Sequence, residues 1–365
     1  MTMTDKVTKL VIVGGFLGAG KTTLISLLTQ TLQDRGQSVG IVTNDQAEDL
    51  VDTKVLAQLG VPVAEVAGSC FCCDFHGLVG AVRRVTSAKP IDVVLAEAVG
   101  SCTDLKATVL LPLQEYSSVR YKVRPLTVVV DPWRLTSILK GGDGGLHPSA
   151  AYIYRLQLQE AQIILINKAD TISDSKSEKL KSEITSLLPG RTIHLVSGVT
   201  GQGVENWIAD LFFDQRKVVA PIEVDYVRYA EGEAILGWYN ASIKLTCPQE
   251  ISWSHYINEL LKLIEKKSKK YAAEIGHVKV FIEHNGLMLS GNIVGKKPGM
   301  SIQGNLGSTT HVSMTINARI QIEATLLGDL IRESIVDVNP NIANTIVTES
   351  CFSPSAPTPT YRIHN

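Results

Sequence analysis

The sequence has no long apolar run, few aromatic residues and almost no net charge. No segment approaches the roughly 20 consecutive apolar residues that a membrane-spanning helix needs. The 35 Lys and Arg residues against 36 Asp and Glu leave a formal charge of -1, so nothing in the balance draws the chain to nucleic acid or to an anionic membrane. With 365 residues, 44% of them hydrophobic although only 6% are aromatic, the chain can bury a substantial core, and we expect two domains.

The first fifteen residues, MTMTDKVTKLVIVGG, lack a long apolar core before a small-residue cleavage site. We therefore expect a cytoplasmic protein. The chain has 6 cysteines, and three of them lie within CFCC at 70–73. In a reducing compartment, clustered cysteines more often bind a metal or perform redox chemistry than form structural disulfides.

Short apolar runs alternate with amphipathic stretches from residue 9 to about 212. The runs are 9–15, 38–45, 61–68, 91–100, 125–133, 161–170 and 191–198. Buried strands alternating with helices predict an α/β fold with a doubly wound, mostly parallel sheet over residues 1–215, of the P-loop NTPase type. Ligands of such sheets bind at the carboxyl ends of the strands, so we look for the site there.

A change of pattern predicts a second domain. We expect a linker with the first strands over 216–238, an α+β ferredoxin-like domain over 239–352 and a flexible tail over 353–365. The predicted strands are 239–247, 278–283, 287–294, 311–324 and 344–350, and the predicted helices are 251–273 and 325–338. The two helices should cover one face of a mixed sheet. The long loop over 295–311 is also expected to be flexible.

A phosphate-binding loop is predicted at GGFLGAGKTT, residues 14–23. Gly15, Gly20, Lys21 and Thr22 have the Walker A spacing, directly after a strand and at the start of a helix. Glycine-rich backbone can turn its N–H groups toward phosphates, Lys21 adds a cation, and the Thr22 hydroxyl can ligate Mg²⁺. The candidate nucleotide-binding residues of this stretch are Gly15, Gly18, Ala19, Gly20, Lys21, Thr22 and Thr23.

A second motif predicts guanine as the base. LINKAD places Asn167, Lys168 and Asp170 at the end of a late strand. The Asp170 carboxylate can accept hydrogen bonds from both N1–H and N2–H of guanine, a donor pair that adenine lacks. After the next strand, the backbone N–H groups of Ser197 and Gly198 can meet guanine O6. Either stretch alone could be an ordinary strand-to-helix turn, but behind a P-loop the two together favour GTP.

Acidic residues near the P-loop predict a magnesium and hydrolytic centre. VTNDQAED offers Asp45 and Glu48 after the second strand, and Glu97 ends an otherwise apolar strand. Such carboxylates can hold Mg²⁺ or orient the attacking water. The alternative is that Asp45, Glu48 or Asp131 caps the following helix. We assign catalytic roles to Lys21, Glu97 and Asp45, and magnesium binding to Thr22, Asp45 and Glu97.

The CFCC stretch lies between a predicted strand and a predicted helix, at the same sheet edge as the P-loop. The thiolates of Cys70, Cys72 and Cys73 can converge on one soft or borderline ion such as Zn²⁺, which leaves a fourth position open. Cys102, five residues beyond Glu97, is a speculative fourth ligand. The alternatives are that these are core cysteines or a structural zinc clip, with a redox sensor less supported.

Taken together, these residues resemble the CobW/HypB/UreG family of metal-handling GTPases, and in particular its CobW-like branch. The motifs GGFLGAGKTT, TND…E, CFCC, EAVG and NKAD occur in the family's order within the first 212 residues. The resemblance implies slow GTP hydrolysis coupled to metal delivery, and a smaller C-terminal domain. It also implies that Lys21 and Thr22 bind phosphate and Mg²⁺, that Asp170 reads guanine, and that the three CFCC thiolates bind the metal.

The leading functional hypothesis is a GTP-hydrolysing metallochaperone, with GTP/GDP and Mg²⁺ at one site and Zn²⁺ or Co²⁺ at another. Its partners would be a metal- or corrinoid-dependent client protein and, in a nucleotide-dependent homodimer, a second copy. We expect no nucleic acid and no membrane partner. The alternative is a GTP-dependent activator of a corrinoid enzyme in which the cysteine cluster is only structural. A third hypothesis, an ATP-dependent kinase, conflicts with NKAD.

Overall fold

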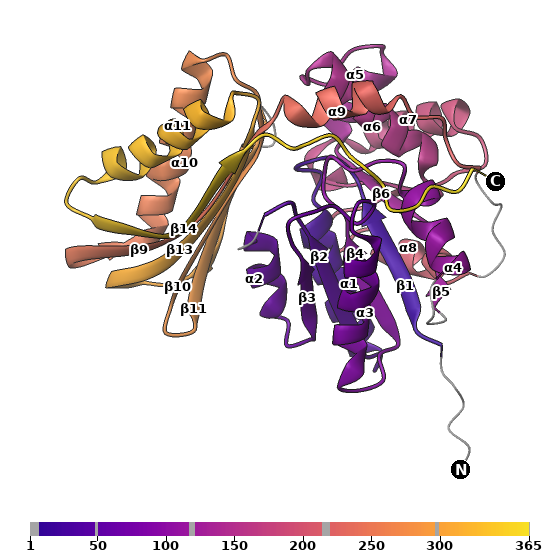
Figure 1. The fold of residues 1–365 in the computed structure, drawn as a ribbon, viewed down its shortest axis with the longest axis horizontal. Coiled ribbons are helices and arrows are strands. Elements are labelled where there is room, and N and C mark those ends of the chain that lie inside the picture. Colours follow the sequence, from indigo (N-terminus) through magenta and orange to yellow (C-terminus); the bar gives the residue numbers. More distant parts are fainter. Residues whose placement is uncertain (1–6, 48–49, 117–120, 214–219, 296–298, 365) are drawn as a thin grey trace. The chain divides into compact units, whose positions relative to one another are not determined.

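The computed structural model describes residues 7–47, 50–116, 121–213, 220–295 and 299–364 (Figure 1). The chain divides into two compact units. The N-terminal unit comprises residues 1–46, 56–232 and 356–365, and the C-terminal unit comprises residues 47–55 and 233–355. No helix among the described residues is both long enough and apolar enough to cross a membrane.

The N-terminal unit is built on a parallel sheet, which confirms the predicted fold class. Its strand order is β3-β2-β4-β1-β6-β7-β8, and a short β5 also pairs with β1. The strands are β1 (Lys9–Gly14), β2 (Val39–Asn44), β3 (Val63–Val66), β4 (Val93–Glu97), β5 (Lys122–Val123), β6 (Thr127–Val130), β7 (Ile163–Ile166) and β8 (Thr192–Leu195). Seven of them coincide with the seven predicted runs, whereas the two residues of β5 are too few to form a sequence pattern.

Helices connect these strands. They are α1 (Lys21–Asp34), α3 (Phe75–Ser87), the π-helix η1 (Lys106–Leu110), α4 (Leu111–Glu115), α5 (Pro132–Leu139), α6 (Pro148–Glu160), the 3₁₀-helix η2 (Ala169–Thr171), α7 (Asp174–Leu187), α8 (Val204–Leu211) and α9 (Tyr226–Ala234). The helical spacing of Leu24, Ile25 and Leu28 places one apolar face of α1 in the core, where it joins buried residues of β1 and β4. This packing fixes the P-loop between β1 and α1.

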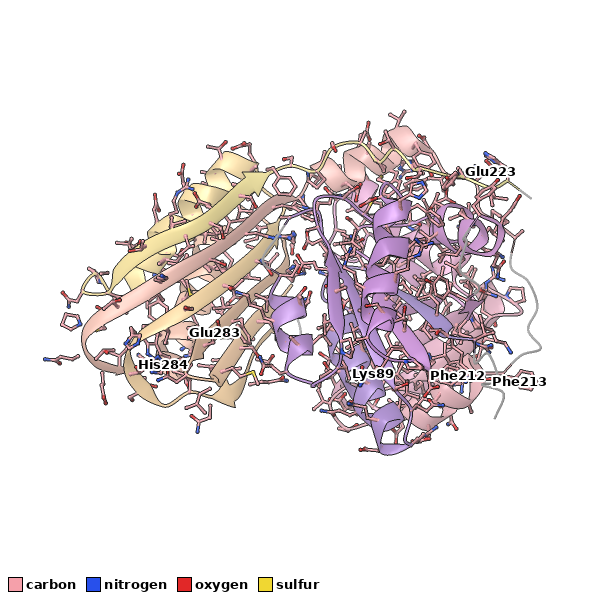
Figure 2. The ribbon with its side chains drawn as sticks, turned by 60° about the horizontal axis from the view of Figure 1, so that its bottom comes forward. Lys89, Phe212, Phe213, Glu223, Glu283 and His284 are labelled. Atoms are coloured by element: carbon pink, nitrogen blue, oxygen red, sulfur yellow. The ribbon has the colours of Figure 1, made fainter. Side chains whose placement is uncertain are left out.

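The C-terminal unit has a six-stranded sheet in the order β12-β11-β10-β13-β9-β14. Its elements are β9 (Gly237–Ser252), α10 (Trp253–Lys270), β10 (Ile275–His284), β11 (Leu287–Val294), β12 (Gly299–Asn305), β13 (Ser308–Ile320), α11 (Ala324–Val338) and β14 (Ala343–Phe352). Within it, β14-β9-β13-β10 has the predicted ferredoxin-like order, and α10 and α11 share its hydrophobic core. Glu283 and His284, labelled in Figure 2, end β10 at the hairpin that leads to β11.

Two predictions for this unit are wrong. Every neighbouring strand pair is antiparallel, so the sheet is not mixed. The expected loop over 295–311 contains β12 and the start of β13. Among the described residues, strand β12 pairs with β11 at the edge of the sheet and is largely exposed. Its apolar alternation is limited to Met300 and Ile302, which is too short to identify a half-buried strand.

Residues 47–55 belong to the C-terminal unit although they follow β2 in the chain. They include the start of α2 (Val51–Ala57). The Val51 N–H donates to Asn317 Oδ1 at 2.7 Å, and Asp52 pairs with Lys279 at 2.6 Å. Asn317 and Lys279 project from β13 and β10, so these strands carry the segment that begins two residues after Asp45. The predicted carboxylate of Glu48 lies outside the described residues.

The C-terminal segment differs from the flexible tail that the sequence predicted. Residues 356–364 belong to the N-terminal unit, and Figure 1 shows the segment, in yellow, running across that unit. The Thr360 N–H donates to Cys72 O at 2.8 Å, and the Ile363 N–H donates to Ala107 O at 3.0 Å. The proline-rich composition correctly predicted the absence of a helix, but the backbone finds its hydrogen bonds on the surface of the N-terminal unit instead of in solvent.

Candidate functional site

The predicted P-loop joins the end of β1 to the start of α1. Gly15 and Gly20 have positive φ values of 126° and 96°, a region that side chains disfavour. A Cβ on Gly15 would lie 2.2 Å from Val129 O. Lys21 Nζ donates to Gly15 O at 2.8 Å, so the cation is folded back over the loop. The geometry is that of a backbone cradle with an ammonium group at its edge, which suits a polyphosphate.

The NKAD motif is tied directly to this loop. Asn167 Nδ2 donates to Ala19 O at 2.9 Å, and Lys168 Nζ donates to Gly18 O at 2.8 Å. Lys168 has a positive φ of 58°, a conformation uncommon for a lysine, and burial lowers the pKa of its ammonium group. Asp170 lies on η2 with its side chain exposed. The candidate base-reading carboxylate therefore emerges next to the candidate phosphate cradle.

The loop after β8 closes on itself. The Oγ of Ser197 accepts hydrogen bonds from the N–H groups of Val199 and Thr200, at 3.3 and 3.1 Å. The Ser197 N–H donates to Gln202 O at 3.0 Å, and the Gly198 N–H donates to Asn167 Oδ1 at 3.0 Å. The two amides that we predicted to meet guanine O6 thus bind protein acceptors in this structure. The loop is nevertheless held against the NKAD motif.

The acidic candidates lie at the ends of two neighbouring strands. Glu97 is the last residue of β4, Asp45 follows β2, and both side chains are buried. Thr22 Oγ1 donates to Glu97 Oε1 at 3.1 Å, which joins the predicted magnesium ligands of α1 and β4. Asp45 lies too far before α2 to cap it. Asp131, in contrast, does cap α5. Its Oδ1 accepts hydrogen bonds from the N–H groups of Trp133 and Arg134 in the first turn of the helix.

The three CFCC thiols converge. Cys70 Sγ lies 2.9 Å from Cys72 Sγ and 3.3 Å from Cys73 Sγ, and the last two sulfurs are 3.7 Å apart. Bonds of about 2.3 Å to a tetrahedral Zn²⁺ separate the sulfurs by roughly 3.8 Å, so small movements would bring all three onto one ion. Cys70 and Cys72 are buried and Cys73 is half-buried. The group meets the geometry of a metal site.

Mutual hydrogen bonding divides the thiols by acidity. Hydrogen bonds with Cys102, Cys72 and Cys73 lower the pKa of Cys70. Hydrogen bonds with Cys102, Cys70 and Cys73, together with burial, raise the pKa of Cys72. Hydrogen bonding to Cys70 raises the pKa of Cys73 to about 11. Cys70 is therefore the thiol that ionises first. A divalent ion has to displace protons from the other thiols, so its binding releases protons.

Sequence reasoning missed Asn44, the residue before Asp45. Its Nδ2 donates to Val66 O at 2.9 Å and to Ser69 O at 2.7 Å, and its Oδ1 accepts from the Phe71 N–H at 2.9 Å. One buried amide thereby holds the segment that leads into the CFCC loop and the first half of the loop itself. Its place at the end of a buried strand was the only signal in the sequence, and a strand end alone does not identify a partner.

The C-terminal segment was also missed as part of the site. The Thr358 N–H donates to Cys73 Sγ at 3.2 Å, and the Tyr361 ring packs edge-on against Phe75 with centroids 5.2 Å apart. Arg362 Nε donates to Asp104 Oδ2 at 2.7 Å, and Asp104 is 1% exposed. These pairs are separated by more than 250 positions in the chain, so no local pattern could have predicted them.

This combination of a parallel sheet, a glycine-rich loop before α1 and an NKAD motif bound to that loop defines a P-loop nucleotide-binding protein. The family model described as CobW/HypB/UreG, nucleotide-binding domain, matches residues 9–194, about half of the chain. The chain belongs to this family, as the resemblance of its motifs predicted.

Several curated proteins are similar to about half of the chain. The zinc chaperone CobW of Pseudomonas aeruginosa is 24% identical over an alignment of 219 residues, and the match covers 52% of this chain and 56% of the relative. The zinc chaperone YeiR of Escherichia coli is 29% identical over 185 residues, 50% of this chain and 51% of the relative. The zinc-regulated GTPase metalloprotein activator 1 of Dictyostelium discoideum is 22% identical over an alignment of 207 residues, and the match covers 49% of this chain and 43% of the relative. The chain spans about half the length of these relatives.

Among solved structures, the chain is similar to the Zn(II)-bound YjiA GTPase from E. coli, with a TM-score of 0.38 and 14% identity over 91% of this chain and 99% of that one. It is also similar to HypB from Helicobacter pylori in complex with nickel. That match has a TM-score of 0.39 and 18% identity over 55% of this chain and 84% of the other.

Proposed function

We propose that this protein is a GTP-hydrolysing metallochaperone that couples its nucleotide state to the delivery of Zn²⁺ or Co²⁺ to a client protein. The observation that carries the proposal is the Asn44 amide, which joins the end of β2, next to Asp45, to the loop of three converging thiols. A nucleotide site and a metal site that share one strand end can be thermodynamically coupled. A shift of that strand end changes the affinity of both sites for their ligands.

In this proposal the nucleotide is GTP or GDP with Mg²⁺. Gly15, Gly18, Ala19, Gly20 and Thr23 form the phosphate cradle with Lys21 and Thr22, while Asn167, Lys168, Asp170, Ser197 and Gly198 form the base side. Lys21 stabilises charge on the transferred phosphoryl group. Thr22, Asp45 and Glu97 hold Mg²⁺ or the waters around it, and Glu97 and Asp45 orient the attacking water. The hydrogen bond from Thr22 to Glu97 at 3.1 Å supports this assignment, since both oxygens then face one small volume.

The cargo in this proposal is bound by Cys70, Cys72 and Cys73. Thiolate donors favour zinc and other soft or borderline ions over Mg²⁺, so the two metal sites of the protein would not compete. The names of the relatives, two of them zinc chaperones, support zinc as the cargo, and Co²⁺ shares its tetrahedral thiolate chemistry. A cytoplasmic protein that acts as a nucleotide-dependent homodimer is part of the same proposal.

A second candidate is a GTP-dependent activator of a corrinoid enzyme, in which the thiol cluster is only structural. The burial of Cys70 and Cys72 favours it, because buried thiols also serve as small apolar groups. The two candidates differ in one respect. Replacing all three cysteines by serine should abolish client activation by a metal carrier, whereas a correctly folded activator should keep it.

Titration of the anaerobically purified, metal-free protein with Zn²⁺ and with Co²⁺ against a chromophoric chelator tests the proposal, in the GDP state and with a non-hydrolysable GTP analogue. We expect one tight site whose affinity changes with the nucleotide and which the C70S/C72S/C73S variant lacks. Cys247→Ser, at a buried cysteine of the C-terminal unit, is the matched control. A site that is indifferent to the nucleotide would leave only the activator.

A further inference from the structure

A fourth buried thiol contacts the cysteine cluster. Cys102 lies on the loop after β4, five residues beyond Glu97, and is 1% exposed. Its side chain is hydrogen-bonded to the thiols of both Cys70 and Cys72. These are the two buried members of the cluster, whereas Cys73 is the half-buried one. Cys70, Cys72 and Cys73 lie within 4.8 Å of one another and Cys102 is not part of that group, so its thiol has to shift toward Cys73 to complete a tetrahedron.

The backbone of Cys102 is fixed by buried groups. Its N–H donates to Val99 O at 3.0 Å. The side-chain amide of Gln157, itself 2% exposed, donates to Cys102 O at 2.8 Å and to Gly100 O at 3.1 Å. Both backbone polar groups of Cys102 are therefore held, which fixes the backbone from which its thiol projects and favours the pre-organisation that a metal ligand needs.

We propose that Cys102 is the fourth ligand of a closed, four-thiolate zinc site formed with Cys70, Cys72 and Cys73. The proposal rests on the metal site of the proposed function and changes its coordination from three thiolates and an open position to four thiolates. Zn²⁺ prefers four tetrahedral ligands, and a site with four sulfurs excludes water. Binding converts the remaining thiols to thiolates and releases their protons to solvent.

The surroundings suit the negative charge of such a site. Four thiolates around Zn²⁺ carry a net charge of −2, which in a buried place needs hydrogen-bond donors. The Thr358 N–H donates to Cys73 Sγ at 3.2 Å, so a backbone amide of the C-terminal segment already points at the outermost sulfur. The cluster also lies just before the N-terminus of α3, whose backbone dipole favours negative charge.

The position of Cys102 places one metal ligand within reach of the nucleotide. Two residues earlier, Gly100 packs so tightly on the P-loop that a Cβ would lie 2.5 Å from Leu17 Cδ2 and 3.0 Å from the Leu17 N. Three residues before that, Glu97 accepts the hydrogen bond of Thr22. A single loop thus runs from a candidate magnesium ligand past the P-loop to the fourth thiol. None of the other three cysteines lies on it.

Zinc K-edge absorption spectroscopy of the nucleotide-free, zinc-loaded wild-type protein under reducing, oxygen-free conditions counts the sulfur ligands directly. We expect four sulfurs at about 2.3 Å and no nitrogen or oxygen ligand. Three sulfurs with one lighter ligand in the wild-type protein would overturn the proposal. This measurement needs no variant, so it does not depend on how well a variant folds.

The Cys102→Ser variant gives the second test, with Cys247→Ser as its control. We expect three sulfurs and one lighter ligand in Cys102→Ser. Loss of an outer-shell partner alone weakens metal binding by roughly 10- to 100-fold, so chelator competition should show at least that loss for a direct ligand. An unchanged sulfur count and affinity would overturn the proposal. If the wild-type zinc site has three sulfurs and its affinity still depends on the nucleotide, Cys102 is not a ligand but the metallochaperone function is retained. If the wild-type protein binds no zinc, both proposals are wrong.

Discussion

The Oδ1 of Asn44 accepts a hydrogen bond from the N–H of Phe71 at 2.9 Å, and this bond joins the end of β2 to the middle of the CFCC loop. Asn44 is 7% exposed, so water cannot readily replace the bond. Because the next residue is Asp45, a candidate magnesium ligand, the bond connects the candidate nucleotide site to the thiol cluster.

Asn44→Ala should uncouple the two sites. The substitution leaves the Phe71 N–H without its acceptor, and an unsatisfied buried donor costs about 1–3 kcal/mol. The Val66 carbonyl still accepts from the Asp45 N–H. We expect lower stability and a zinc affinity that no longer differs between the GDP and GTP-analogue states. Asn44→Asp is the matched variant, because it keeps the acceptor for Phe71 and loses the two donors. Full nucleotide dependence of zinc affinity in a folded Asn44→Ala protein would rule out this route.

Arg362→Ala should loosen the C-terminal segment from the metal site. The ion pair with the buried Asp104 is lost, as is the hydrogen bond from Arg362 to Ile222 O at 2.9 Å. We expect Zn²⁺ to transfer to a chelator several-fold faster in stopped-flow measurements, because Thr358 then no longer holds its amide against Cys73. Arg332→Ala removes a comparable ion pair in the C-terminal unit and should leave the rate unchanged. Equal rates in both variants would count against a covering role for the segment.

Asp170→Asn should change the base preference. The Asp170 carboxylate accepts both guanine donors, whereas an asparagine side chain offers one acceptor and one donor, which matches the N1–H and the C2 carbonyl of xanthine. We expect the variant to bind xanthosine triphosphate better than GTP, by competition with a fluorescent nucleotide, with zinc binding preserved. If the variant kept the wild-type preference for GTP, Asp170 would not be the base reader.

Glu160 should make stability depend on pH. Burial raises its pKa to about 8, and the Thr103 hydroxyl and the Lys106 backbone N–H donate hydrogen bonds to its carboxyl group. The folded state therefore keeps a proton that the unfolded state loses near pH 4.5, so the free energy of unfolding should fall as pH rises from about 4.5 to about 8. The slope from this one group is at most about 1.4 kcal/mol per pH unit.

The Glu160→Gln variant isolates this contribution. Gln157, on the same helix, holds the Cys102 loop, so urea unfolding from pH 5 to pH 8 should be followed together with zinc affinity. We expect the variant to lose the downward slope and to gain stability relative to wild type as pH rises. Parallel pH profiles for the two proteins would show that Glu160 is not protonated in the folded state.

The sequence predicted those parts of the molecule that local chemistry determines. The strand runs, the P-loop glycines and the three thiols all follow from short patterns, because a backbone with positive φ at Gly15 or a buried parallel strand restricts which residues can occupy it. The predicted grouping of Lys21, Asn167 and Lys168 near one loop also followed from the rule that ligands bind at strand ends.

What the sequence did not predict are contacts between distant segments. Asn44 has no distinctive neighbours, and the pairing of Arg362 with Asp104 depends on where a segment without secondary structure lies. Composition predicted a flexible tail, because proline and serine disfavour regular structure. It could not show that the backbone amides of this segment find acceptors at Cys72, Cys73 and Ala107. Strand β12 was missed for a similar reason, because its partner β11 rather than its own pattern determines it.

In the proposed function, GTP binding changes the affinity for zinc, and zinc binding changes the affinity for GTP by the same factor. Measuring both factors is the most direct test. Isothermal titration of a non-hydrolysable GTP analogue into the metal-free and the zinc-loaded protein gives the ratio of its two dissociation constants. The account predicts that this ratio equals the factor by which the same analogue changes zinc affinity, and that it becomes one in the C70S/C72S/C73S variant. A ratio of one in the wild-type protein, with zinc demonstrably bound at the thiols, would contradict the account.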